Sequence, residues 1–190
     1  MHFRTPKGDR LIQLGRDLVV INQLQPYPRF ENWEPSIYST LEVYRQLVHP
    51  QEITKLGVRY INHVVVPDET TGQHGSFPME DYFTIYPQLP GGIAGIHGPF
   101  LVRVEVPRPE TGHTLQITFG SSPWKQAAES TLLLDLYDIF EPRRQLGVDE
   151  VRKHVRMAHR SIESAFEGSI TDRLRNMLEP EGPHEFADNP

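Results

Sequence analysis

The chain has 190 residues, of which 37% are hydrophobic and 23% are charged, and its formal net charge is −6. This length fits a single domain with a sizeable core, and the composition is typical neither of a disordered chain nor of a membrane protein. The absence of cysteine excludes disulfides, thiolate metal sites and a cysteine nucleophile. With no signal-peptide core and no apolar run of roughly 20 residues, we expect a cytoplasmic protein.

Alternating β-branched residues open the chain. Leu11–Gly15 and Leu18–Asn22 surround a short turn and predict a β-hairpin. After a proline-rich link, apolar residues recur at helical spacing from Pro35 to Val48, with the proline suited to the first turn. Residues Lys55–Val66 are rich in valine and isoleucine and predict a central strand.

The middle of the chain alternates loops and strands. Residues 67–78 are polar and predict a loop, Met79–Tyr86 fits a short helix, and the Gly- and Pro-rich residues 87–99 predict a surface loop. Three further strands complete the predicted sheet: Phe100–Val106, Thr114–Phe119 and Thr131–Tyr137.

The last element is the clearest. From Val148 to Met177 apolar residues are spaced by three or four, which predicts an amphipathic helix of about eight turns. Gly168-Ser169 interrupts the pattern, so we expect a kink or restart there, with Ser169 and Asp172 resembling a capping box. The polar residues 181–190 predict a disordered tail.

These elements together predict an α+β fold. We expect one domain over residues 1–180, with a largely antiparallel sheet of five to six strands packed under the long C-terminal helix and accompanied by one shorter helix.

Several separated motifs resemble a sporadically distributed bacterial family of conserved hypothetical proteins that carry a Gly-Leu-Arg-Tyr-Ile-Asn strand. That signature stands here as Gly57-Val58-Arg59-Tyr60-Ile61-Asn62. Leu24-Gln25-Pro26-Tyr27-Pro28, Leu134-Asp135-Leu136-Tyr137-Asp138 and His159-Arg160-Ser161-Ile162 also match, in the same order. The resemblance covers most of residues 3–178 and implies no assigned activity. Members look as if they begin with a further strand and helix, which we expect this chain to lack. The missing strand would leave one sheet edge open, and an open edge can pair with another chain.

Arg59, Tyr60 and Asp135 are the candidate pocket residues. Strand alternation places Arg59 and Tyr60 on opposite faces, whereas Arg59 and Asp135 can meet on one face as a buried pair. The pair is either a structural ion pair or part of an anion- or amide-binding pocket roofed by the final helix.

Histidine, glycine and serine patterns give no catalytic or metal motif. His154 and His159 are five apart, which is off the spacing that shares a helix face, and a zinc site would have to use histidines and carboxylates alone. The Gly-rich residues 91–98 lead into a strand and not into a helix N-terminus, unlike a phosphate-binding loop. We therefore expect no metal, no cofactor and no catalytic residues.

Basic charge is concentrated in one late segment. Between residues 143 and 160 six cations accompany two anions, although the chain as a whole is acidic. These cations are candidates for binding an anionic partner, against the alternative of a solvated helix face: Arg143, Arg144, Arg152, Lys153, Arg156 and Arg160.

The sequence favours a non-enzymatic interaction or regulatory module that works with a protein partner or as a homo-oligomer. One alternative is a nucleic-acid-binding module that uses the basic helix face, and another is a small-ligand sensor or enzyme with a pocket near Arg59 and Asp135. No contact with a membrane is expected.

Overall fold

The computed structural model describes residues 1–66, 78–88, 90, 99–122 and 130–178. The chain divides into two compact units, residues 1–54 with 142–153 and residues 55–141 with 154–190, so the expectation of one domain over 1–180 stays a prediction. The predicted tail, 181–190, lies outside the described residues. Within the described ranges, no helix is long and apolar enough to cross a membrane.

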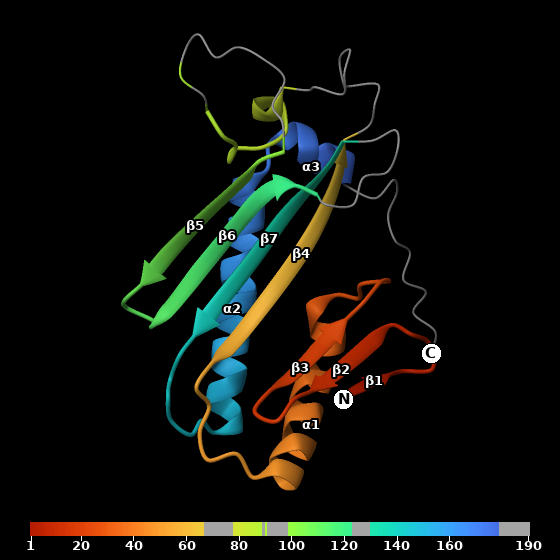
Figure 1. The fold of residues 1–190 in the computed structure, drawn as a ribbon, viewed down its shortest axis with the longest axis vertical. Helices are drawn as coiled ribbons and strands as arrows, with labels where there is room; N and C mark the ends of the chain where they lie inside the picture. Colours follow the sequence, from red (N-terminus) through yellow and green to blue (C-terminus); the bar gives the residue numbers. More distant parts are fainter. Residues whose placement is uncertain (67–77, 89, 91–98, 123–129, 179–190) are drawn as a thin grey trace, which may run out of the picture. The chain divides into compact units, whose positions relative to one another are not determined.

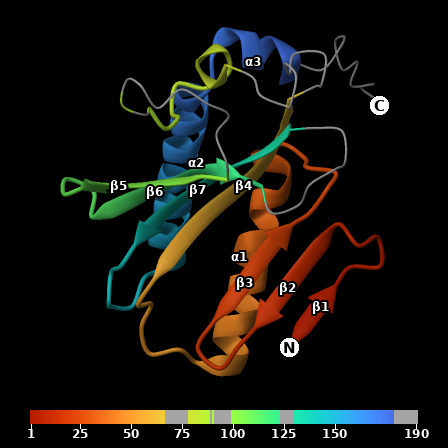
Figure 2. The same cartoon turned by 45° about the horizontal axis from the view of Figure 1, so that its top comes forward.

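The first unit contains a three-stranded antiparallel sheet in the order β1 (His2–Arg4), β2 (Arg10–Leu14) and β3 (Val19–Gln23). The predicted hairpin is confirmed: β2 and β3 pair, and the N–H of Gly15 donates to the carbonyl of Leu18 at 2.8 Å. β1 was not predicted, because three residues are too few to show an alternation. Figure 2 shows α1 running along this sheet beside β3.

α1 (Phe30–Val48) ends where the sequence predicts but begins earlier than Pro35. Phe30 is buried and its ring contacts that of Trp33 edge to face, with centroids 5.8 Å apart. This packing extends the helix backwards, and Pro35 therefore lies inside it, where one backbone hydrogen bond is missing.

The second unit contains a four-stranded antiparallel sheet (Figure 1). Its spatial order is β4-β7-β6-β5, so the strand predicted to be central, β4, lies at one edge and β5 at the other. All four strands were predicted, with bounds that differ from the observed ones by at most three residues. They are β4 (Leu56–Val66), β5 (Leu101–Arg108), β6 (His113–Ser121) and β7 (Ser130–Phe140).

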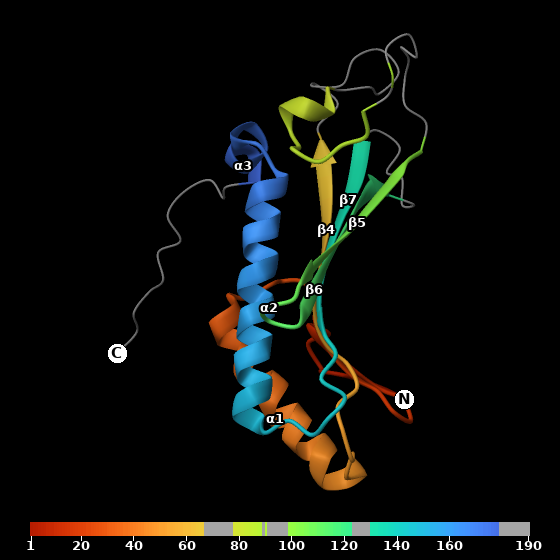
Figure 3. The same cartoon turned by 90° about the vertical axis from the view of Figure 1, so that its left-hand side faces the viewer.

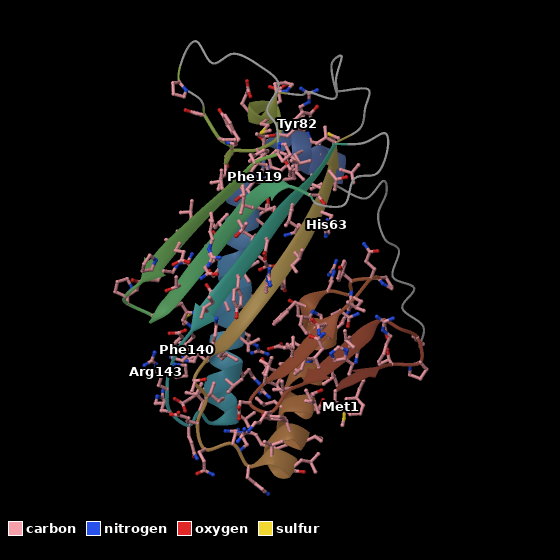
Figure 4. The ribbon with its side chains drawn as sticks, in the orientation of Figure 1. Met1, His63, Tyr82, Phe119, Phe140 and Arg143 are labelled. Carbon is pink, nitrogen blue, oxygen red and sulfur yellow. The ribbon has the colours of Figure 1, made fainter. Side chains whose placement is uncertain are left out.

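The core of this unit lies between one sheet face and α2 (Val148–Ser169), as Figure 3 shows with the sheet seen nearly edge on. Val64, Leu134 and Leu136 on the strands pack with Ile162 of α2 in one buried cluster. Phe119 belongs to the same cluster and lies towards the end of the sheet where Tyr82 is found (Figure 4). Alternation along each strand therefore assigns one face to the core and the other to solvent or partners.

Residues 79–86 depart from the predicted helix. A single 3-10 turn, Met79–Asp81, is followed by irregular backbone that includes an isolated β-bridge between Phe83 and Ile170. The carbonyl of Tyr82 accepts the N–H of Thr171 at 2.9 Å, and the N–H of Thr84 donates to the carbonyl of Ser169 at 3.0 Å. These tertiary bonds replace the ones a helix would have made.

The predicted restart of the final helix is confirmed, because α2 ends at Ser169 and α3 runs over Asp172–Leu178. The predicted capping residue is wrong. The hydroxyl of Ser169 donates back to the carbonyl of Ala165 at 2.7 Å, whereas the hydroxyl of Thr171 accepts the N–H of Leu174 at 3.4 Å. Thr171 is thus the residue in the position to cap α3.

The α+β class, the antiparallel pairing and the long C-terminal helix are confirmed. The prediction of one sheet with five to six strands is wrong, since the strands divide between sheets of three and four. A sequence pattern identifies strands but not their partners, and β4 pairs with β7, which lies far along the chain.

Candidate functional site

Polar side chains from four elements meet between the sheet and α2 in the second unit. The strand register sets Arg108 of β5 opposite His113 of β6, and sets Asp138 of β7 opposite Leu115, two residues along the same face. Helix α2 supplies the remaining members. We call the set the buried polar cluster: Arg108, His113, Asp138, His154 and Ser161.

Asp138 is the centre of this cluster, and its residue is 0% exposed. One carboxylate oxygen accepts from Nδ1 of His113 at 2.5 Å, and the other accepts from the hydroxyl of Ser161 at 2.6 Å. Arg108 donates from Nη1 to Ser161, and the same nitrogen lies 3.6 Å from Asp138 Oδ2. A buried carboxylate is costly unless it is paired and hydrogen-bonded, and both conditions are met here.

A second imidazole continues the chain of hydrogen bonds. Nε2 of His113 lies 2.9 Å from Nδ1 of His154, and the ring of His154 stacks on Phe140 with centroids 3.7 Å apart. Because a carboxylate only accepts, Nδ1 of His113 is the donor to Asp138, whereas the donor between the two imidazoles is set by their tautomers.

The cluster resembles part of a catalytic triad but differs in the group that the imidazole contacts. In a triad the imidazole held by the aspartate contacts a hydroxyl or thiol nucleophile. Here His113 contacts another imidazole, and the hydroxyl of Ser161 is bonded to Asp138 itself. The arrangement orders side chains and satisfies a buried charge.

Sequence reasoning missed this cluster, although a signal existed. His113 alternates with the apolar Leu115, and Asp138 alternates with Leu136, so both polar residues occupy inward positions of buried strands. Inward polar residues need partners. Which partners they find depends on strand pairing, which the sequence pattern does not specify.

Tyr60 faces the same side of the sheet. Its hydroxyl lies 2.8 Å from Nδ1 of His159, and Nε2 of that ring lies 3.3 Å from a carboxylate oxygen of Glu163. His159 and Glu163 are one helical turn apart on α2, a spacing at which two side chains lie on the same helix face.

Arg59 and Asp135 meet on the opposite face, as the sequence predicts, but the pair is not buried, because the side chain of Arg59 is 52% exposed. Nε and Nη2 of Arg59 donate to the two carboxylate oxygens at 2.8 and 2.5 Å. This hydrogen-bonded contact is the main cause that raises the pKa of Arg59 above its ordinary value, with the charge of Asp135 adding to it. Tyr60 does not join the pair, and the expectation that the final helix roofs it is wrong, because α2 covers the other face.

A shallow hollow surrounds this ion pair. Its volume is about 190 Å³, below the usual range of about 300–1,000 Å³ for ligand pockets. Its lining is largely polar or charged: Arg59, Arg103, Gln116, Thr118, Asp135 and Tyr137. That a small ligand binds here stays a prediction.

The predicted basic residues are all exposed, but some have partners. Arg144 binds Glu150 at 2.8 Å, a hydrogen bond that raises the pKa of this arginine, and Arg152 lies over the ring of Tyr38, 4.8 Å from its centroid. Arg143 (Figure 4) has a φ of 48°, an uncommon conformation for a residue other than glycine. The exposed cations of α2 are Arg152, Lys153, Arg156 and Arg160.

No histidine cluster suited to a metal ion is formed within the described part of the chain. Comparison with known proteins gives no match to a family model, to a curated protein or to a solved structure. The resemblance to the conserved bacterial family therefore stays a prediction.

Proposed function

We propose that this chain is a non-enzymatic interaction module that works with a protein partner through the β5 edge of its four-stranded sheet. The observation that carries the proposal is the exposure of β5, whose Leu101, Val104 and Val106 are 68%, 42% and 38% exposed. Edge strands present backbone N–H and C=O groups that can pair with another chain.

The chemistry of the interior supports a non-enzymatic role. His113 and Ser161 each hydrogen-bond to Asp138, so these polar groups help to satisfy a buried charge. The exposed hollow near Arg59 is small for a substrate pocket.

A nucleic-acid partner is the alternative, and the four exposed cations of α2 favour it. One of them, Arg152, is already stacked on an aromatic ring, and Arg144 before the helix is neutralised by Glu150. These contacts reduce the number of cations that a phosphate backbone could use.

The test is capture of the tagged chain at native expression level, with the mass and nucleic-acid content of the complex measured. The V104K variant places a charge at the middle of β5, where Val104 is 42% exposed, and charge on an edge strand is a device that blocks edge pairing. V65K is the matched control, since Val65 is 39% exposed on the other edge strand, β4.

We expect the unmodified chain and V65K to retain a bound protein, and V104K to lose it. A complex that survives V104K would contradict the proposal. Bound nucleic acid in place of protein would support the basic helix face instead.

A further inference from the structure

β5 has one free side within the described sheet. β6 pairs with it on one side, and no described strand pairs with it on the other. Figures 1 and 2 show β5 as the outermost strand on the side away from β4.

Backbone geometry shows which residues of β5 present their N–H and C=O groups outward. The N–H of Ser121 donates to the carbonyl of Phe100 at 3.0 Å, which extends the register of β6 with β5 by one pair. Since alternate residues bond in an antiparallel ladder, even-numbered residues of β5 bond to β6 and odd-numbered residues point away. The outward positions of β5 are Leu101, Arg103, Glu105 and Pro107.

Pro107 is consistent with this assignment. Proline has no N–H, and within sheets it is found on edge strands where that N–H would have faced solvent. Because Pro107 points away from β6, its missing N–H removes no hydrogen bond between β5 and β6.

The two outward-facing charges of β5 flank Val104, an arginine before it and a glutamate after it. Arg103 and Glu105 lie on one sheet face and pair along the strand at 2.9 Å, with side chains 55% and 52% exposed. An antiparallel strand with the same sequence, centred on Val104, would present a glutamate to each arginine and an arginine to each glutamate.

We propose that β5 pairs antiparallel with β5 of a second copy of this chain, with the twofold axis at Val104. Arg103 of each copy lies opposite Glu105 of the other, and both residues exchange backbone hydrogen bonds because both point outward. On the other sheet face the two Val104 side chains meet. The inference rests on the proposed function and names its partner.

Neighbouring registers are excluded by charge. Centring the pairing on Arg103 would set two arginines opposite each other, and centring it on Glu105 would set two glutamates opposite. The other edge of this sheet, β4, carries Arg59 as its single Lys, Arg, Asp or Glu residue, so no self-pairing of β4 forms an ion pair. Of the two edge strands described in this sheet, β5 is therefore the one whose charges select a second copy in one register.

Charge reversal tests the pairing. R103E alone and E105R alone each create two like-charge pairs, so we expect the dimer dissociation constant of each to rise about tenfold or more. Mixing the two single variants, or combining both changes in one chain, restores opposite charges and should restore the dimer. R173E is the control, because Arg173 is an exposed arginine of α3 that pairs with Asp81.

The measurement is the molar mass of the purified chain over a concentration series, by sedimentation or light scattering. A constant monomer mass for the unmodified chain would overturn the inference, as would two single variants that fail to rescue each other. If the chain is monomeric while V104K still abolishes capture of a different protein, the proposed function stands and only the second copy is rejected.

Discussion

At the scale of single residues, Asp138 is the least exposed of the buried polar and charged residues in the described chain. Its carboxylate is fully buried, and the permanent positive charge of Arg108, whose side chain is 31% exposed, lies 3.6 Å from it. His113 and Ser161 orient the carboxylate, whereas Arg108 balances its charge. Removing one partner of a buried ion pair leaves an uncompensated charge, which costs more than the pair contributed.

We therefore expect R108A to lower the free energy of unfolding by about 3 kcal/mol. Chemical denaturation monitored by circular dichroism measures this change. R160A is the matched control, since Arg160 is exposed on α2 and its loss should change stability by less than about 0.5 kcal/mol. Equal effects of the two variants would show that the buried polar cluster does not depend on Arg108.

At the scale of elements, the junction of β5 and β6 depends on a close approach at Gly120. A Cβ atom at this position would lie 2.6 Å from the backbone carbonyl of Phe100, so one of the strands would have to move. Gly168, near the end of α2, is different, because nothing lies within 4 Å of the equivalent atom.

Two alanine substitutions should therefore change the stability of the protein in opposite directions. We expect G120A to destabilise the protein by about 2 kcal/mol through steric overlap. We expect G168A to stabilise it by about 0.5–1 kcal/mol, because alanine favours a helix over glycine. Chemical denaturation of both variants measures these changes. If G120A left the free energy of unfolding unchanged, β5 and β6 would be able to move apart at this point without loss of stability, which would contradict the prediction.

Local patterns predicted the strands and the final helix, and long-range contacts account for the errors. Alternation located β4 to β7, and helical spacing located α2 with its break at Gly168-Ser169. Residues 79–86 were predicted as a helix because their backbone bonds to 169–171 depend on segments far apart in the sequence. The division into two sheets has the same cause, since pairing is decided by tertiary packing.

The candidate sites show the same limit. The contact of Arg59 with Asp135 was predictable, because both residues interrupt apolar strands at outward positions. The buried polar cluster was not, because it requires the order of β5, β6 and β7 and the placement of α2 over them.

At the scale of the whole molecule, the central claim is that a second copy binds through β5. In the proposed register the two Val104 residues form a non-hydrogen-bonded pair, with Cα atoms about 4.5 Å apart. This separation lies within the range of about 4.4–6.8 Å that a disulfide spans. The two Val106 residues would be about 13 Å apart, since four residues of strand separate them along the axis.

The most direct measurement is disulfide formation by V104C, compared with V106C as a control of similar exposure. The chain has no cysteine, so each variant carries a single thiol. We predict that mild oxidation converts V104C to a covalent dimer, observed by non-reducing electrophoresis, while V106C stays monomeric. Equal crosslinking of both variants, or none at Val104, would contradict the pairing of β5 with a second copy.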